Sequence, residues 1–161
     1  MILIALGANL PSSAGAPAAT LRSALVRLEE RGVKILSVSS FYETAAWPDQ
    51  SEPAFVNAVA AVETPFQPIE LLALLHGVET DFGRLRSVPN APRTLDIDLL
   101  DYEGRILSER VMLPHPRMAE RSFVMVPLAE IAPDWRHPIL GQGAAELLTL
   151  LPDQNSCKKL A

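Results

Sequence analysis

Two aspartates separated by one residue, Asp96 and Asp98, are the side chains in this sequence best suited to chemistry. They lie in the run 95–102, whose apolar residues predict a buried strand. Successive strand side chains point to opposite faces, so both carboxylates share one face, while Asp101 is expected on the other and is a weaker ligand. Paired carboxylates repel each other unless a cation lies between them, and hard oxygen ligands suit Mg²⁺. The pair therefore predicts a magnesium site with room for two ions, although an isolated Asp-x-Asp is more often a solvated strand face.

The arginines near this pair suggest which kind of ligand the metal would bind together with the aspartates. The chain has eleven arginines and three lysines. Guanidinium groups match phosphate oxygens in geometry, so arginines that converge on the aspartates would bind a polyphosphate, whereas composition alone favours separate solvated side chains. Seven of the arginines lie between residues 84 and 121, namely Arg84, Arg86, Arg93, Arg105, Arg110, Arg117 and Arg121.

Several other routes to chemistry are excluded by motif. No Gly-x-x-x-x-Gly-Lys-[Ser/Thr] loop occurs, and the stretch 141–143 (Gly-Gln-Gly) lacks the third glycine of a dinucleotide fingerprint. Neither a His-Glu-x-x-His motif nor a cysteine pair supports a zinc site, and no serine has the setting of a nucleophile elbow. Phosphate binding must then come from the metals and the arginines.

Size and composition indicate one domain, residues 1–161, with its own core. The net charge of −5 argues against a nucleic-acid partner. The apolar run 1–6 has no basic residues before it and is too short to span a membrane, so we expect a buried strand there. The single Cys157, expected as a surface thiol, fits a reducing compartment. We expect a cytoplasmic monomer without a membrane partner.

The elements that must position these side chains follow from hydrophobic periodicity and turn residues. Their order, βαββαβ, matches an α+β fold of ferredoxin-like type, in which two helices cover one face of an antiparallel sheet. The segment 43–53 is expected as a long loop, and a C-terminal α/β extension as carrying short helices near 123–131 and 144–151. The expected strands are 1–6, 33–40, 55–62 and 95–102, and the expected helices are 18–31 and 68–83.

The ordered set of short motifs resembles the 6-hydroxymethyl-7,8-dihydropterin pyrophosphokinases of the folate pathway. Each motif alone is weak, but together they are specific. They run from about residue 2 to residue 133 and comprise Gly7-Ala8-Asn9-Leu10, Ser39-Ser40-Phe41-Tyr42-Glu43-Thr44, Phe55-Val56-Asn57-Ala58, Pro92-Arg93-Thr94-Leu95-Asp96-Ile97-Asp98, and Pro114-His115 followed by Arg117, Arg121 and Phe123.

The resemblance implies transfer of pyrophosphate from ATP, with two Mg²⁺ ions, to the hydroxymethyl group of the pterin. By position it implies Asp96 and Asp98 as metal ligands and Arg84 and Arg93 as the arginines that stabilise the migrating phosphates. The implied ATP contacts are Glu79, Arg86, Leu99, Arg110, His115 and Arg121. The implied pterin contacts are Thr44, Ala45, Trp47, Phe55, Asn57 and Phe123.

The residues themselves are compatible with that assignment. Phe55 and Phe123 have the flat faces needed to clamp a heterocycle, and Asn57 offers both a donor and an acceptor to its edge. The segment 87–91 departs from the resemblance, since it is shorter than in many members and lacks the arginine and tryptophan that many of them carry there.

Two alternatives stay open. Nucleotidyltransferase and cyclase domains also place paired aspartates on such a sheet, and a module without catalytic activity would use the same arginines to bind an anionic effector.

Overall fold

The computed structural model describes residues 1–161 except 47, 86–88, 90 and 91. The elements follow one another as β1 (Ile2–Ala8), α1 (Pro17–Glu30), β2 (Lys34–Val38), β3 (Tyr42–Thr44), β4 (Phe55–Glu63), α2 (Pro68–Asp81), β5 (Asp96–Tyr102), β6 (Leu107–Ser108), β7 (Met112–Leu113), the 3-10 helix η1 (Met118–Glu120), α3 (Ser122–Ile131), α4 (Ala144–Thr149) and β8 (Lys158–Lys159). The expected strands and helices form within a few residues of their predicted ends.

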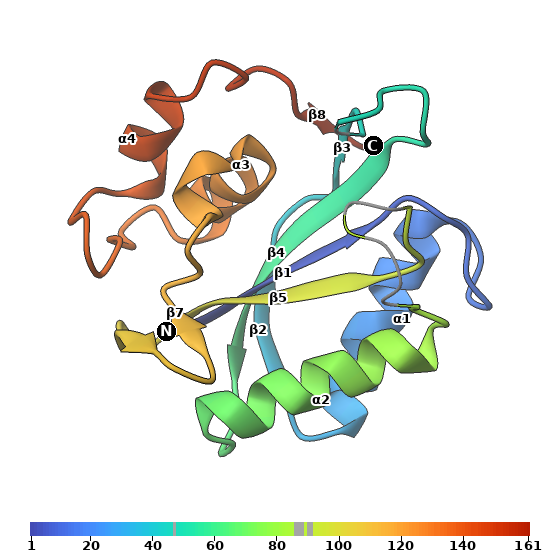
Figure 1. The fold of residues 1–161 in the computed structure, drawn as a ribbon, viewed down its shortest axis with the longest axis horizontal. Coiled ribbons are helices and arrows are strands. Elements are labelled where there is room, and N and C mark those ends of the chain that lie inside the picture. Colours follow the sequence, from blue (N-terminus) through green and yellow to red (C-terminus); the bar gives the residue numbers. More distant parts are fainter. Residues whose placement is uncertain (47, 86–88, 90–91) are drawn as a thin grey trace.

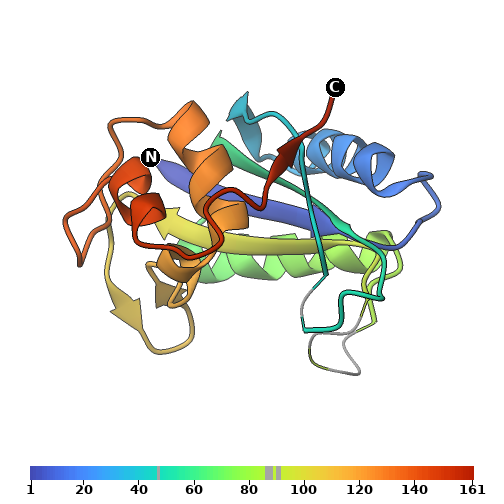
Figure 2. The ribbon, with the colours of Figure 1, turned by 90° about the horizontal axis from the view of Figure 1, so that it is seen from above.

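One antiparallel sheet carries the fold. Its strands pair in the order β5-β1-β4, and β4 then pairs with β2 along one half of its length and with β3 along the other half. The structure is therefore a mixed α+β protein with an antiparallel sheet and helices, and Figures 1 and 2 show the helices on both sides of that sheet.

The two faces of the sheet are covered differently. Helices α1 and α2 pack on one face over a fully apolar cluster that includes Ile4, Leu6 and Leu71. Helices α3 and α4 pack on the other face over a smaller cluster that includes Leu3 and Met125. Both expected helices of the first half of the chain thus lie on one side, and the short C-terminal helices lie on the other (Figure 1).

A β-bulge in β5 corrects one expectation about the acidic residues. Leu3 pairs with Asp101 and Ile4 with Leu99, which leaves Leu100 as an extra residue in the ladder. The bulge interrupts the alternation, so Asp101 lies on the same face as Asp98 and not on the opposite one. Its carboxylate is buried and accepts hydrogen bonds from Trp135 Nε1 at 2.7 Å and from the Gly104 backbone at 2.9 Å, so it is committed to the core.

A second correction concerns the segment 43–53, which begins in a strand. Tyr42–Thr44 pairs with β4, and the C-terminal Lys158–Lys159 pairs in turn with Tyr42 and Glu43. A three-residue strand has too few side chains for a periodic signal, so only its partners define it. The same pairing brings Cys157 against the protein: its thiol is half-buried, 3.9 Å from Ser122 Oγ, and burial raises the pKa of that thiol.

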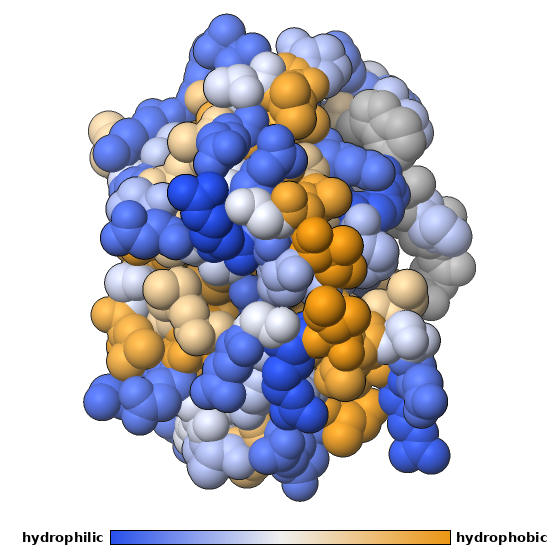
Figure 3. Space-filling model, turned by 90° about the vertical axis from the view of Figure 1, so that its left-hand side faces the viewer, coloured by the Kyte–Doolittle hydropathy of each residue, from blue (hydrophilic) through white to orange (hydrophobic). Residues whose placement is uncertain are grey.

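The outer surface is mixed in character. Figure 3 views the side on which α4, the N-terminus and β7 lie, and shows a band of apolar residues among hydrophilic ones. Exposed apolar side chains in these segments include Met1, Met112 and Leu150. Apolar atoms make up more than half of a typical folded surface, so such residues are ordinary. In the described ranges, no helix is both long enough and apolar enough to cross a membrane.

Candidate active site

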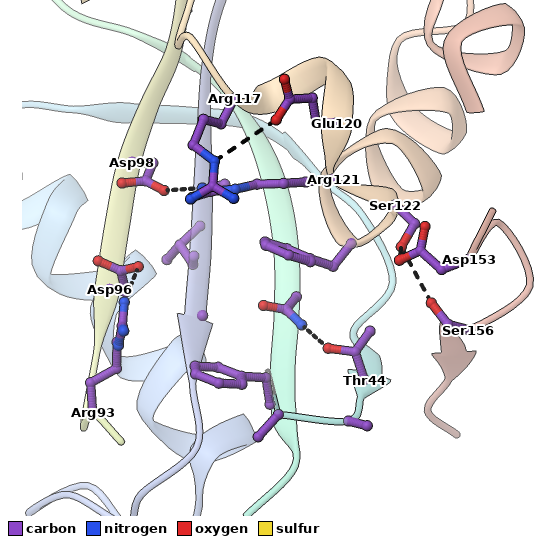
Figure 4. A pocket seen from close by; sticks show the side chains of 18 of the residues that line it. Thr44, Arg93, Asp96, Asp98, Arg117, Glu120, Arg121, Ser122, Asp153 and Ser156 are labelled. Carbon is purple, nitrogen blue, oxygen red and sulfur yellow. Dashed lines mark hydrogen bonds and ion pairs between the residues drawn. The ribbon is translucent and has the colours of Figure 1, made fainter. Parts of the chain in front are cut away.

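A cavity of about 460 Å³ opens on the sheet face that α3 covers only in part. Strands β1, β4 and β5 form its floor, and α3, the loop after β3 and the C-terminal tail form its sides (Figure 4). Its lining residues are Ala5, Leu6, Gly7, Thr44, Ala45, Ala46, Gln50, Phe55, Asn57, Arg93, Asp96, Asp98, Arg117, Glu120, Arg121, Ser122, Phe123, Asp153 and Ser156.

Small residues of β1 make room for the cavity. The side chains that β1 directs to this face shrink from Leu3 to Ala5 to Gly7 along the strand. A Cβ atom on Gly7 would come within 2.9 Å of Asn57 Oδ1, so only glycine leaves the Asn57 amide in place. The buried Asn57 in turn donates a hydrogen bond to Thr44 Oγ1 at 2.9 Å. The amide and the hydroxyl therefore stand fixed at the cavity floor.

Asp96 and Asp98 both line the cavity, as the strand alternation predicts. Asp96 accepts hydrogen bonds from Arg84 Nη1 at 2.8 Å and from Arg93 Nη1 at 3.0 Å. Asp98 accepts one from Arg121 Nη1 at 3.3 Å, and His115 Nε2 lies 3.8 Å from the same oxygen. Figure 4 shows Arg93 beside Asp96 and Arg121 beside Asp98. Each carboxylate thus has its own arginine partners.

The two carboxyl groups differ in their electrostatic setting. Burial disfavours ionisation of Asp96, but the hydrogen bond from Arg84 and the charges of Arg93 and Arg84 outweigh it and lower its pKa. Burial and then the negative charge of Asp96 raise the pKa of Asp98 despite the nearby His115 and Arg121. Burial also lowers the pKa of His115, which favours a neutral imidazole. Asp98 is therefore the carboxylate that gains most from an added cation.

The donor set fits a hard divalent cation. Asp98 Oδ1 has no hydrogen-bond partner among the described residues, and the negative charge of Asp96 adds to burial in raising the pKa of the Asp98 carboxyl. Arg84 and Arg93 already neutralise the charge of Asp96. They therefore share with the metal the task of offsetting the repulsion between the two carboxylates. No cluster of three or more His, Cys, Asp or Glu side chains suited to a metal occurs in the described ranges. Magnesium commonly takes one or two carboxylates together with water and substrate phosphates, which matches this pair.

Arg93 is held in place by the segment that follows β1. Its backbone N–H donates to Asn9 Oδ1 at 2.8 Å, and its carbonyl accepts from the N–H groups of Asn9 and Leu10, both at 3.1 Å. Asn9 is buried and adds a hydrogen bond to the Pro53 carbonyl at 3.0 Å. The motif Gly7-Ala8-Asn9-Leu10 therefore both opens the floor and fixes an arginine.

Two arginines connect the charged end of the cavity with its aromatic end. The Arg93 guanidinium carbon lies 5.8 Å from the centre of the Phe55 ring, and that of Arg121 lies 5.5 Å from the centre of the Phe123 ring. Each guanidinium thus contacts an aromatic ring while it hydrogen-bonds an aspartate, an arrangement that suits its flat shape. The predicted anionic and aromatic residues consequently belong to one site.

Glu79 and Arg84 lie behind this lining. Glu79 is 1% exposed; its Oε1 accepts from the Ile97 backbone at 3.3 Å, and its Oε2 lies 3.6 Å from Arg84 Nη1. Arg84 also donates to the Leu95 carbonyl at 2.9 Å. Glu79 therefore orients Arg84 toward Asp96, and it does not line the cavity itself.

Other expected residues lie outside the cavity. The Leu99 side chain is buried in the cluster under α1 and α2, on the opposite face of the sheet. Arg110 borders a separate surface depression near Gln67. Arg86 and Trp47 lie outside the described residues, as does most of the segment 87–91.

Sequence reasoning missed part of the lining. Arg117 stands among the clustered arginines, but Gln50, Glu120, Ser122, Asp153 and Ser156 carried no signal of their own. The polar tail 153–159 would have drawn attention only if its pairing with the short strand β3 had been foreseen.

The fold and the site define a class: an α+β protein with a small-ligand cavity that is charged at one end and aromatic at the other. Within it, the chain belongs to the 7,8-dihydro-6-hydroxymethylpterin-pyrophosphokinase (HPPK) family, whose pattern it matches over residues 3–133.

Relatives and solved structures place that match in context. The 2-amino-4-hydroxy-6-hydroxymethyldihydropteridine pyrophosphokinase of Pseudomonas aeruginosa is 38% identical over 152 residues, which are 94% of this chain and 91% of that protein. The folic acid synthesis protein fol1 of Pneumocystis carinii is 35% identical over 96% of this chain, but the chain spans only 20% of its length. A crystal structure of Plasmodium falciparum HPPK-DHPS superposes with a TM-score of 0.71 at 14% identity, covering 98% of this chain and 46% of that one.

Proposed function

We propose that this chain transfers pyrophosphate from ATP to 6-hydroxymethyl-7,8-dihydropterin, giving AMP and the pterin diphosphate, a step of folate biosynthesis. The observation that carries the proposal is that one cavity joins the Asp96–Asp98 pair and its arginines to the Phe55, Phe123 and Asn57 side chains. Family membership and the names of the relatives support the same activity.

The architecture proposed for this activity is one pyrophosphokinase domain, residues 1–161, with a ferredoxin-like core. The strand order β5-β1-β4-β2 with α1 and α2 on one face supports that assignment. The residues after β5 would form a C-terminal α/β extension that covers part of the second face.

Asp96 and Asp98 are the proposed ligands of two Mg²⁺ ions. Bound Mg²⁺ would neutralise charge on the phosphate oxygens, which lowers the barrier to attack by a neutral hydroxyl. Asp98 has the free oxygen for this role, and Asp96 is held in position by Arg84 and Arg93.

The arginines supply the fixed part of the charge stabilisation. Arg84 and Arg93 would stabilise the migrating phosphates, and Arg121 with His115 would contact the nucleotide. Preorganised guanidiniums in a partly buried cleft need little reorganisation as charge develops in the transition state. Glu79 acts through Arg84, while Leu99, Arg110 and Arg86 are proposed as further ATP contacts, Leu99 through its backbone.

The pterin would occupy the aromatic end. Phe55 and Phe123 would clamp the flat ring, and Asn57, Thr44 and Ala45 would contact its edge, with Trp47 as a further contact. This placement directs the hydroxymethyl group toward the aspartates. The hydroxyl oxygen attacks the β-phosphorus, the bond from that phosphorus to the oxygen bridging to the α-phosphate breaks, and the hydroxyl proton passes to solvent as AMP leaves. No side chain is assigned as an essential general base, so positioning provides most of the rate.

The proposal includes the location, oligomeric state and partners of the protein. We expect a cytoplasmic monomer acting on two small molecules without a nucleic-acid or membrane partner; an acidic net charge of −5 agrees with that expectation.

Product analysis tests the function. The purified chain is incubated with ATP, MgCl₂ and 6-hydroxymethyl-7,8-dihydropterin, with an EDTA-treated control, and the nucleotides are separated. AMP and a pterin diphosphate in equal amounts are expected, and EDTA should stop their formation. Released pyrophosphate with a nucleotide-linked product would instead identify a nucleotidyltransferase, and binding without any product would identify a module without catalytic activity.

A further inference from the structure

The bulge in β5 fixes the backbone of His115. Leu100, the extra residue of the bulge, accepts a hydrogen bond through its carbonyl from the His115 backbone N–H at 2.8 Å. His115 comes shortly after β7, so this contact ties the chain that follows β7 to β5. The position of the His115 backbone therefore depends on the place of Leu100 in the strand.

A second contact orients the His115 ring. Its Nδ1 accepts a hydrogen bond from the Arg117 backbone N–H at 3.1 Å, so a neutral imidazole carries its hydrogen on Nε2. That Nε2 lies 3.8 Å from Asp98 Oδ2, at the end of the cavity where the phosphates of the nucleotide would bind. His115 can therefore donate to the nucleotide only if its backbone stays where Leu100 holds it.

Asp101 stabilises the bulge against a regular ladder. Residues two apart in a regular strand share a face, so without the extra residue Asp101 would join Leu99 in the apolar cluster under α1 and α2. A carboxylate is costly to bury there, because apolar side chains offer it no donors. In the bulged strand Asp101 is 3% exposed, and it accepts from Trp135 Nε1 at 2.7 Å and from the Gly104 N–H at 2.9 Å. The carboxylate and its donors therefore favour the bulged register.

We propose that Asp101 is a positioning residue for nucleotide binding, because it holds the bulge that places His115 beside Asp98. The inference rests on the proposed function, in which His115 contacts ATP. The Asp101 carboxylate lies in the core against Trp135 and acts only through the backbone. Without it, β5 should shift toward a regular ladder, which moves the Leu100 carbonyl and His115 with it. The nucleotide end of the cavity is then disturbed, while the aromatic end keeps its geometry.

Calorimetric titration of a nonhydrolysable ATP analogue with MgCl₂ tests this role. The proteins are wild type, Asp101→Leu and the control Leu147→Ala, whose side chain is 4% exposed and lies in the same apolar cluster as Trp135. The control should lose stability but bind the analogue as wild type does. Asp101→Leu should bind it about tenfold more weakly, as expected when a polar contact of the ligand is displaced. Affinity of Asp101→Leu within about twofold of wild type, or an equal loss in the control, would overturn the proposal.

The route through His115 is tested in a His115→Ala background. There Asp101→Leu should weaken analogue binding by less than about a further twofold, since both changes remove the same contact. The His115 amide should also exchange its hydrogen faster in Asp101→Leu than in wild type, whereas amides of the β1–β4 ladder should stay protected. A full further loss of affinity, or unchanged exchange at His115, would contradict this route.

A milder variant, Trp135→Phe, decides the matter if Asp101→Leu does not fold. It keeps an aromatic ring in the core and removes one of the two donors to Asp101. Analogue binding should weaken in the same direction, by about threefold, because the carboxylate is left only partly satisfied. Affinity equal to that of wild type would overturn the proposal.

Kinetics distinguish this failure from failure of the proposed function. Wild type that forms no AMP contradicts the function itself. Wild type that forms AMP, together with an Asp101→Leu variant whose KM for ATP is unchanged, contradicts only the role of Asp101. The expected variant has a raised KM for ATP and an unchanged KM for the dihydropterin.

Discussion

The two faces of the sheet differ: helices cover one face completely, and the other face opens into the cavity. On the face under α1 and α2, β1 presents Ile2, Ile4 and Leu6, all of them buried. On the face under α3 the same strand presents Leu3, then Ala5 and Gly7, and the cavity opens where the side chains become small. A closed face and an open face thus alternate residue by residue along a single strand.

The charged side chains of β5 are also restricted to one of the two faces. Asp96 and Asp98 lie on the open face, whereas their neighbours Ile97 and Leu99 lie in the closed one. Ionised groups are costly to bury unless they are paired, and the open face provides both water and arginine partners. The difference teaches that substitutions on the closed face should affect stability, and those on the open face should affect ligands and turnover.

The largest effect is expected for Asp98→Ala on the open face. Turnover should fall at least about a thousandfold, because a metal ligand and its charge stabilisation are lost. Stability should stay the same or rise, since burial disfavours the ionised form of this carboxyl and raises its pKa. AMP release and thermal unfolding measure the two quantities, with Asp134→Ala as the control. Substantial activity of Asp98→Ala in the presence of Mg²⁺ would contradict the metal assignment.

The counterpart on the closed face is Ile4→Ala. Ile4 is 0% exposed, and a cavity left by removing such a side chain costs about 3 kcal/mol of unfolding free energy. Below its unfolding transition the variant should keep values of kcat and KM close to those of wild type. Urea unfolding and steady-state kinetics check the pair of results. A large change in kcat with little loss of stability would show that the two faces are not separable in this way.

A smaller effect is expected for Gly7→Ala, which fills part of the open face. Its new Cβ would approach Asn57 Oδ1 to 2.9 Å and displace the amide from its hydrogen bond to Thr44. The KM for the dihydropterin should rise about tenfold, as expected when a buried polar contact is disturbed, while the KM for ATP stays near the wild-type value. In an Asn57→Ala background the same substitution should add little. A full further loss in that background would place the cause elsewhere.

The smallest effect concerns the helix that partly covers the open face. Glu130 of α3 accepts hydrogen bonds from Tyr42 Oη at 2.6 Å and from Ser40 N and Oγ at 3.0 and 2.8 Å, and so holds α3 to β3. Burial opposes its ionisation, but the Tyr42 and Ser40 hydrogen bonds outweigh it and lower the pKa of Glu130. Burial and the same contact raise the pKa of Tyr42 to about 12.

The sign of the pH dependence follows from the lowered pKa. The contribution of Glu130 is complete above the ordinary pKa of a glutamate and is lost as the pH falls through the lowered folded-state value. Glu130→Gln should therefore cost about 1 kcal/mol at neutral pH, a modest figure because the group is exposed and screened, and the cost should vanish in acid. Urea unfolding of wild type, Glu130→Gln and the control Glu109→Gln over this range measures it. A difference that persists unchanged in acid would rule out the carboxylate as its source.

Much of the fold could be predicted because its signals are local. Apolar residues at helical spacing place α1 and α2, and strand alternation places Asp96 and Asp98 together on one face. Cys157 is a free thiol as expected but is half-buried, and the loop expected over 43–53 is a strand in its first two residues, because β3 and β8 exist only through their pairing with each other and with β4. The resemblance implied Arg110, Leu99 and Arg121 alike as ATP contacts, yet only the Arg121 side chain lines the cavity, while those of Arg110 and Leu99 lie away from it.

The sequence by itself determined which side chains share a face, since backbone geometry fixes that over a few residues. It also determined the family, through the order of short motifs along residues 3–133. Only the tertiary structure decided that a bulge turns Asp101 toward Trp135, that Asn9 anchors Arg93, and that the tail brings Asp153 to the cavity. Register and long-range contact depend on partners distant in the chain, and no local pattern of residues encodes those partners.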